Sequence, residues 1–230
     1  MRPIVRLLTT AAAALLSLAP LQTQARAQTP VQTPASSHPT STPYTGPLNI
    51  FDEPGRDQKL QIQHVMDVLN LHPGSIVADI GAGGGWFSVR AARRVAGGPH
   101  GSGRVIAEDI NPDAISAIRT RAATEHLTNI VPLLGTPDDP RLTPDSLDAA
   151  LMLRVYHEIA HPPLLLAHLH DALKPHARFG VIDHPGHGDD HGINPSVVIA
   201  EVQRNGFHLI HQYDFTKGDQ NDYMLVFERR

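Results

Sequence analysis

A glycine-rich turn constrains the fold of this chain more than any other feature of its sequence. Residues 75–89 read SIVADIGAGGGWFSV, in which an apolar, β-branched run ends at Ile80 and a helical pattern begins at Trp86. Glycines between them let a ligand approach the backbone where any β-carbon would collide, and the N-terminus of the next helix faces that ligand. The sequence therefore predicts a strand, a turn and a helix that bind a nucleotide-like ligand. The alternating glycines of the turn are Gly81, Gly83 and Gly85.

The same turn argues against a nicotinamide dinucleotide as the ligand. The dinucleotide fingerprint GxGxxG requires a third glycine at position 86, and this chain has Trp86 there. An NAD-dependent oxidoreductase built on the same strand order is therefore the least favoured of the functions that we consider.

The first 27 residues predict a secretory signal peptide. Two arginines precede an apolar stretch over residues 7–19, and the small residues Ala25 and Ala27 form a signal-peptidase site. We expect cleavage after Ala27 and export to the periplasm. The apolar stretch is shorter than the roughly 20 residues that a membrane-spanning helix needs, so we expect no stable membrane insertion after cleavage. The chain has no cysteine, which excludes disulfides and thiolate metal sites.

The composition changes at about residue 50. Residues 28–50 predict a disordered linker, because Pro, Thr, Ser and Gln dominate and almost no large apolar side chain is available for a core. Residues 51–230 are long enough for one domain with its own core. The formal net charge of −4 argues against nucleic acid as the main partner, since nucleic-acid binding usually needs a basic face. No residue pattern indicates an oligomeric state.

Helical and strand patterns alternate after residue 51, which is typical of an α/β fold with a mostly parallel sheet. The last two strands are close enough in sequence to pair as antiparallel neighbours. The expected helices cover residues 56–71, 86–95, 111–125, 161–173 and 194–205, and the expected strands cover 75–80, 104–110, 130–134, 146–153, 178–183, 207–215 and 223–228.

An acidic pair, Glu108 and Asp109, ends the second strand. Asn111 and Pro112 then begin a helix, so Asp109 is expected at the carboxyl edge of the sheet beside the glycine turn. A carboxylate there can accept two hydrogen bonds from ribose hydroxyls, while Glu108 should point to the other face of the sheet. We assign ribose binding to Asp109; the alternative is an aspartate that only supports the start of the helix.

Polar side chains follow the fourth strand at the same edge. Tyr156, His157 and Glu158 form a catalytic candidate set that can move a proton near neutral pH, with His157 as the general base. The alternative for His157 is a packed histidine bonded to backbone. Arg154, at the end of the strand, is counted among the cofactor contacts, with an anionic substrate as its alternative partner.

The loop after the fifth strand, residues 184–191, contains three histidines and two aspartates. Such a loop can hold a metal. The chain has 15 histidines spread along its length, however, so histidine is common everywhere and the loop is not distinctive. We therefore expect no metal site and favour a flexible lid over the substrate.

The ordered set of motifs resembles the class I S-adenosylmethionine (SAM) dependent methyltransferases, over roughly residues 51–229. The motifs are VADIGAGGG, VIAEDINPD, LLGTPDDPRL, SLDAALMLRVYHEI, LKPHARFGVID and YMLVF. Within that family the chain resembles a group of undefined substrate that often begins with a signal sequence. The resemblance implies a Rossmann-like class I methyltransferase fold: a mostly parallel seven-stranded sheet with an antiparallel C-terminal strand and helices on both faces.

The resemblance also implies the cofactor, SAM, and the residues that contact it. The loop after the third strand borders the adenine in this family; Thr136 stands where many members have aspartate, so the adenine contact is moved to Asp138. The chain lacks the Asn-Pro-Pro-Tyr sequence of some amide N-methylating subgroups. The expected cofactor contacts are Asp79, Gly81, Gly83, Gly85, Asp109, Ile110, Asp138 and Arg154.

The function implied is in-line transfer of a methyl group from SAM to an acceptor, which we expect to be a small molecule. Because SAM is made in the cytoplasm, export leaves a second function open: a non-catalytic module that binds SAM or another nucleoside. The sequence identifies neither the acceptor nor the acceptor atom.

Overall fold

The computed structural model describes residues 38–98, 103–214 and 222–229. The chain divides into two units, Met1–Gln32 and Thr33–Arg230, and all described residues belong to the second. The predicted signal peptide, residues 1–27, lies outside the described residues.

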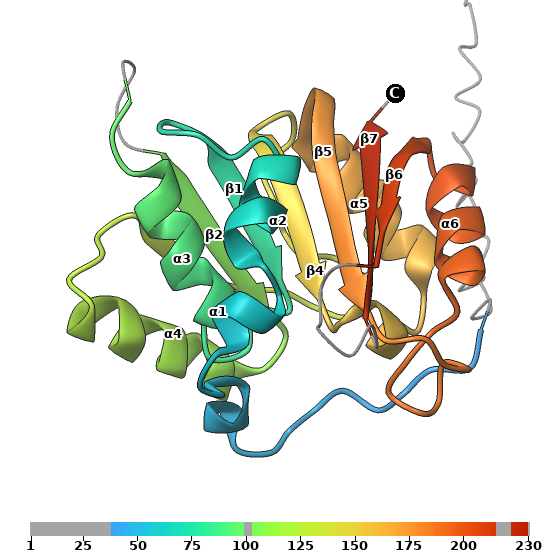
Figure 1. The fold of residues 1–230 in the computed structure, drawn as a ribbon, viewed down its shortest axis with the longest axis horizontal. Helices are drawn as coiled ribbons and strands as arrows, with labels where there is room; N and C mark the ends of the chain where they lie inside the picture. The colour runs from blue at the N-terminus through green and yellow to red at the C-terminus, as the bar shows by residue number, and fades with distance from the viewer. Residues whose placement is uncertain (1–37, 99–102, 215–221, 230) are drawn as a thin grey trace, which may run out of the picture. The chain divides into compact units, whose positions relative to one another are not determined.

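Seven strands form one sheet in the order β3-β2-β1-β4-β5-β7-β6 (Figure 1). The first five strands in this order run parallel, and β7 pairs antiparallel with both β5 and β6. This is the expected fold class, with the reversed strand between β5 and β6. The strands are β1 (Ile76–Ile80), β2 (Arg104–Asp109), β3 (Ile130–Leu134), β4 (Leu147–Leu153), β5 (Leu173–Asp183), β6 (Phe207–Tyr213) and β7 (Tyr223–Arg229).

Helices cover both faces of the sheet. On one face, buried side chains of α2, α3 and α4 join alternate strand residues such as Val77 in one core. On the other face, α5 and α6 cover the intervening residues such as Ala78. Successive residues of a strand therefore alternate between the two cores, as strand alternation requires. The helices are α1 (Arg56–Lys59), α2 (Ile62–Val68), α3 (Trp86–Val95), α4 (Pro112–Thr124), α5 (Pro162–Ala172) and α6 (Pro195–Arg204), with short 3₁₀ helices η1 (Leu48–Phe51) and η2 (Tyr156–Glu158).

Two elements differ from the expectation. The helix predicted over residues 56–71 is broken into α1 and α2 at Gln61, whose φ of 46° is left-handed and cannot continue a helix. The fifth strand begins at Leu173, five residues earlier than predicted. Its register with β4 shifts between the pairs Leu147–Leu173 and Ala149–Arg178. Pro175 falls in this irregular part of the strand, where its missing N–H costs no ladder bond.

The second half of the expected linker also differs. Residues 38–47, which we call the N-terminal strap, run along the edge where the parallel strands end (blue in Figure 1). His38 and Ser41 in the strap are buried. The segment keeps no regular structure, yet it is held by contacts to residues more than 100 positions away. Composition alone predicted disorder because the strap carries few large apolar side chains of its own.

Among the described residues, no helix is both long enough and apolar enough to cross a bilayer.

Candidate active site

The turn after β1 adopts a backbone that only glycine tolerates easily. Gly81, Gly83 and Gly85 have φ values of 66°, 52° and 77°, all in the left-handed region. A β-carbon on Gly81 would lie 2.6 Å from Cγ2 of Val155, so the turn after β4 packs directly against it. Gly85 is the N-cap of α3. The sequence pattern is thus explained by chain geometry, and the turn presents its backbone to a cavity.

Asp79, at the end of β1, is buried beneath this turn. Its carboxylate accepts a hydrogen bond from Oγ of Ser88, at 2.5 Å, in the first turn of α3. Burial raises the pKa of Asp79 to about 7; the Ser88 hydroxyl opposes this rise and the nearby Asp109 adds to it.

Asp109 ties the turn after β1 to the turn after β2. Its two carboxylate oxygens accept hydrogen bonds from the backbone N–H groups of Gly83 and Asn111, both at 2.8 Å. Burial raises its pKa, and these hydrogen bonds limit the rise. Asp109 and Ile110 both line the cavity, beside the glycine turn where ribose binding was expected.

Glu108 is a cavity residue that the sequence reasoning set aside. Strand alternation holds, because the neighbouring β2 residues Ala107 and Ile106 belong to different cores. The long Glu108 side chain nevertheless reaches the edge of the sheet and lines the cavity. Burial raises its pKa to about 8, and Asp109 adds to the rise. Three acidic groups therefore surround this part of the cavity.

The loop after β3 contributes Thr136 and Pro137 to the cavity lining, but not Asp138. The Asp138 carboxylate instead lies 2.8 Å from Nδ1 of His161, at the N-cap of α5. Asp138, to which we assigned the adenine contact, therefore does not line the cavity. The Asp138 side chain thus points from the Pro-Asp-Asp-Pro turn toward the start of α5.

The cavity itself has a volume of about 730 Å³ and runs along the carboxyl edge of the sheet. We call the part formed by residues 81–84, 109–111 and 136–137 the glycine side; Gly85 caps α3 and is not in the lining. The opposite part, which we call the histidine side, is formed by strap residues 40–45 and, in the turn after β4, by Arg154, Val155 and Glu158.

Between the two sides, Arg56 faces the cavity. Its guanidinium lies 4.3 Å from the ring centre of Trp86 and donates to the carbonyl of Phe51 at 2.6 Å. Burial lowers the pKa of Arg56 to about 10, and Arg154 contributes to the lowering. Asp57, the next residue in the chain, instead forms an ion pair with Arg90, at 2.7 Å.

The residues Tyr156, His157 and Glu158 form the 3₁₀ turn η2, which sends their side chains in different directions. Tyr156 is fully buried, and its hydroxyl donates to Glu201 of α6 at 2.9 Å. Burial raises its pKa well above the usual value, as does Glu201. Tyr156 is not in the cavity lining, so the catalytic role assigned to it is corrected to a core contact.

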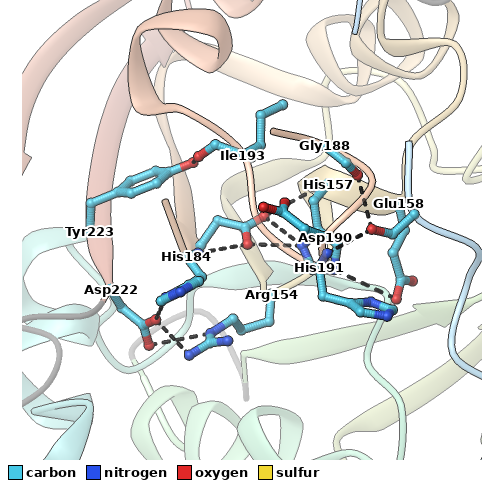
Figure 2. Close-up of polar contacts among 12 residues, drawn as sticks. Arg154, His157, Glu158, His184, Gly188, Asp190, His191, Ile193, Asp222 and Tyr223 are labelled. Carbon is cyan, nitrogen blue, oxygen red and sulfur yellow. Dashed lines mark hydrogen bonds and ion pairs between the residues drawn. The ribbon is translucent and has the colours of Figure 1, made fainter. Parts of the chain in front are cut away.

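Glu158 faces the cavity, and His157 lies behind it (Figure 2). Nδ1 of His157 lies 2.9 Å from Oδ1 of the fully buried Asp183, and Nε2 lies 3.8 Å from Oε1 of Glu158. Burial raises the pKa of the Glu158 carboxyl to about 7, while His157 opposes the rise. Of the described residues at this turn, Glu158 rather than His157 is therefore the group that an acceptor can reach.

Arg154 lines the cavity in a left-handed conformation, with φ of 61°. Its guanidinium pairs with the buried Asp222 before β7, at 2.6 Å, and Asp222 also lies 3.6 Å from Nδ1 of His184 (Figure 2). Arg154 thus joins the ends of β4 and β7 and contributes a positive group to the cavity wall.

The strap completes the histidine side, and sequence reasoning missed it. The backbone N–H of Ser41 donates to the carbonyl of His157 at 3.0 Å, and its hydroxyl bonds to Gly188 O and to His191 N, both at 2.9 Å. The N–H of Tyr44 donates to Oε1 of Glu158 at 3.2 Å. The apolar residues Tyr44 and Leu48, set among polar neighbours, were the available signal for this packing.

Comparisons with known proteins agree with the fold. Residues 77–176 match a family model described as "Methyltransferase domain", which covers the elements from β1 into β5. A comparison with curated protein sequences gives no significant match.

Several solved structures are similar in fold. A SAM dependent methyltransferase from Aquifex aeolicus has a TM-score of 0.71 and 19% identity, over 80% of this chain and 97% of that one. An S-adenosylmethionine dependent methyltransferase from Mesorhizobium loti has a TM-score of 0.62 and 18% identity, over 76% and 100% of the two chains. The [4+2]-cyclase SpnF has a TM-score of 0.63 and 13% identity, over 74% and 80%.

The chain thus has the Rossmann-like methyltransferase fold and contains a methyltransferase domain match. Two of the similar structures are described as dependent on S-adenosylmethionine, the cofactor that the sequence predicts for this chain.

Proposed function

We propose that this chain is a SAM-dependent methyltransferase that acts on a small-molecule acceptor. The observation that carries the proposal is that one cavity joins the glycine side to Glu158. Its volume of about 730 Å³ lies within the range of about 300–1,000 Å³ that is typical of small-molecule sites. SAM on the glycine side and an acceptor near Glu158 would share this cavity, so the methyl group could pass directly from one to the other.

The glycine side suits SAM by charge as well as by shape. Asp79, Glu108 and Asp109 are all buried acidic groups, and burial raises the pKa of each. A ligand with a sulfonium and an ammonium group adds positive charge next to these carboxyls, beyond the charge of Arg56 that acts on Asp79. The turn of Gly81 and Gly83 allows that ligand close to the backbone.

The residues that line the cavity would have separate roles in cofactor binding and in proton transfer. Asp109 would hold the ribose hydroxyls, and the glycine turn would hold the methionyl part of the cofactor. When bound, SAM supplies an already activated methyl group, so positioning carries most of the catalysis. Glu158 would take the proton from an acceptor that must lose one, with a pKa of about 7 that suits this task. Asp183 fixes the imidazole of His157 behind Glu158.

The strap supports a small acceptor rather than a polymer. Residues 40–45 line the cavity on the histidine side and so cover the edge of the sheet from which an acceptor would enter. An acceptor must therefore fit beneath the strap. We also propose that the chain is exported to the periplasm after cleavage behind Ala27, which N-terminal sequencing of the mature protein tests.

Binding and transfer are tested separately. Trp86 is the only tryptophan and lines the cavity, so its fluorescence reports ligand arrival during titration with SAM, its demethylated product or NAD. Saturable binding of SAM but not of NAD is expected. Transfer is then measured as tritium that moves from methyl-labelled SAM into a filtered small-molecule extract, with stoichiometric formation of the demethylated product.

The results separate the alternatives. No calorimetric or fluorescence response to either SAM species on folded protein overturns the proposal. Tight SAM binding without transfer to any fraction of the extract favours the non-catalytic binding module. A response to NAD that exceeds the response to SAM favours the oxidoreductase.

A further inference from the structure

Three metal-ligating side chains converge outside the glycine side. His157 and Glu158 come from the turn after β4, and His191 comes from the loop after β5. One ligand atom of each lies within 4.8 Å of the others. Figure 2 shows the three side chains turned toward one another, although His191 lies more than 30 residues from the other two in the sequence.

His157 is oriented as a ligand rather than as a free base. Both oxygens of Asp183 lie within hydrogen-bond distance of Nδ1, at 2.9 and 3.1 Å. Asp183 also accepts the backbone N–H groups of His157, at 3.2 Å, and His184, at 2.8 Å, so the carboxylate cannot turn away. A buried carboxylate at Nδ1 places the proton there and leaves the lone pair on Nε2. A carboxylate or carbonyl partner of this kind orients most metal-binding histidines.

The spacing between His157 and Glu158 suits an ion better than a hydrogen bond. Nε2 of His157 and Oε1 of Glu158 are 3.8 Å apart, which is too long for a direct hydrogen bond. Two ligands at about 2.0–2.2 Å from a common zinc ion in tetrahedral geometry lie roughly 3.3–3.6 Å apart. The observed separation therefore needs only a small adjustment to admit an ion.

Ser41 of the strap holds the two histidine segments together. Ser41 bonds through its N–H to the carbonyl of His157 and through its hydroxyl to the N–H of His191. The rings of His157 and His191 meet edge to face, with centroids 5.9 Å apart. The pair is thus brought together by contacts that do not themselves involve a metal, so the site is formed before an ion arrives.

We propose that His157, Glu158 and His191 bind a divalent transition-metal ion such as zinc. Two imidazole nitrogens and one carboxylate are the ligand set of one class of catalytic zinc site, in which a fourth position stays open. Glu158 lines the cavity, so the open position faces the space where the acceptor is expected. The sequence had directed attention to the loop of residues 184–191 alone, and only its last histidine takes part.

The ion site points to the chemistry of the acceptor. An ion at the histidine side would bind an acceptor through a hydroxyl or thiol and lower the pKa of that group. With the ion bound, Glu158 would serve as a ligand, so the proton of the acceptor would leave to water instead of to Glu158. The oxygen or sulfur would then attack the methyl group as its bond to the sulfonium breaks. This consequence rests on the proposed methyl transfer; binding of the ion does not.

The test uses the full chain, without a histidine tag, stripped of metal by a chelator and then dialysed. Calorimetric titration with Zn²⁺, in the absence of SAM, is expected to show one ion bound per chain. Titration with Co²⁺ is expected to give visible absorption bands from a site of low coordination number. Neither readout depends on methyl transfer, so failure of the proposed function would leave this result unchanged.

His191→Ala is the decisive variant, because His191 is exposed and its loss should not prevent folding. We expect its Zn²⁺ affinity to fall by about 100-fold or more, since loss of an outer partner of a ligand alone costs about 10–100-fold. His187→Ala is the matched control, because it removes an exposed histidine of the same loop that is outside the cluster. His157→Gln serves as a second ligand variant, with circular dichroism to confirm folding.

Equal Zn²⁺ affinity in the wild-type chain and in His191→Ala would overturn the proposal, as would the absence of stoichiometric binding. Equal losses in His187→Ala and His191→Ala would assign the binding to scattered surface histidines, and this also overturns it.

Discussion

The two sides of the cavity are built in different ways. On the glycine side, each loop follows its own strand, and Asp109 joins its neighbours Gly83 and Asn111 through backbone N–H groups. On the histidine side, Ser41 binds two segments that lie more than 100 residues from it in the sequence, and it does so with its own side chain and backbone. One side is fixed by local conformation, and the other is fixed by docking of a strap.

This difference indicates how each side responds to change. A turn held by left-handed glycines and a buried aspartate keeps its shape as long as the sheet is folded. A strap without regular structure can open locally at a lower free energy than the sheet. We therefore expect binding of the cofactor and processing of the acceptor to be separable by mutation.

Glu158→Gln should give the largest effect. The amide keeps the shape of the side chain but cannot accept a proton, and loss of a general base lowers the rate by about 10²–10⁴-fold. SAM affinity should change little, because Glu158 is on the histidine side. Tritium transfer and SAM calorimetry on the same preparation measure the two quantities.

Glu228→Gln is the control for this variant, since Glu228 pairs with His176 at 2.8 Å and does not line the cavity. It should behave as wild type. Unchanged transfer in Glu158→Gln would remove the base from the mechanism and leave positioning as its main contribution.

Asp109→Ala should show the opposite separation. The variant loses two charge-assisted hydrogen bonds within the protein and the proposed ribose contact. Hydrogen bonds to a charged group contribute roughly 1.5–3 kcal/mol, so SAM affinity should fall by about 10–100-fold. Zn²⁺ affinity, measured without SAM, should stay at the wild-type value. A parallel loss of both affinities would show that the two sides are coupled through the sheet.

The pH dependence of SAM binding sharpens the comparison further. In the ligand-free protein the pKa of Asp79 is about 7 and that of Glu108 about 8. A positively charged ligand favours the carboxylates, so these groups hold fewer protons in the complex than in the free protein. SAM affinity should therefore rise with pH through this range and level off above it, by about tenfold per proton released over one pH unit.

The demethylated product has no sulfonium charge and provides the comparison. Its affinity should rise less steeply over the same range in calorimetric titrations. Equal slopes for SAM and its product would show that the sulfonium does not lie near these carboxyls.

The sequence predicted the parts of the molecule that local chemistry fixes. The mostly parallel seven-stranded sheet and its reversed last strand followed from periodicity and resemblance, and they are confirmed. Gly81 and Asp109 lie at the cavity because the turn conformation and the end of a strand position them. Their roles in cofactor binding stay predictions.

The histidine side could not be read in the same way. In the 3₁₀ turn after β4, consecutive residues point in different directions, and no alternation rule says that Tyr156 enters the core while Glu158 faces the cavity. The Asp138 side chain contacts His161, which belongs to another element, instead of lining the cavity. Ser41 can bind His157 and His191 only because the sheet places these two residues near each other. The composition of the strap does not predict that placement.

Ser41→Ala should have the smallest effect on SAM binding, and its effect should be confined to the strap. It removes the two side-chain hydrogen bonds and leaves the Gly188 carbonyl and the His191 N–H without this partner. Such losses cost about 1–3 kcal/mol when the groups remain buried, which weakens docking of the strap by about 5–150-fold. If the whole domain shares the loss, the melting temperature should fall by about 2–4 °C per kcal/mol. Limited proteolysis should then cut the strap faster, with SAM affinity nearly unchanged.

Thr42→Ala, an exposed neighbour in the same strap, should match wild type. Equal cleavage of the strap in both variants would mean that backbone contacts alone hold it, and a loss of SAM affinity in Ser41→Ala would mean that the strap also shapes the glycine side.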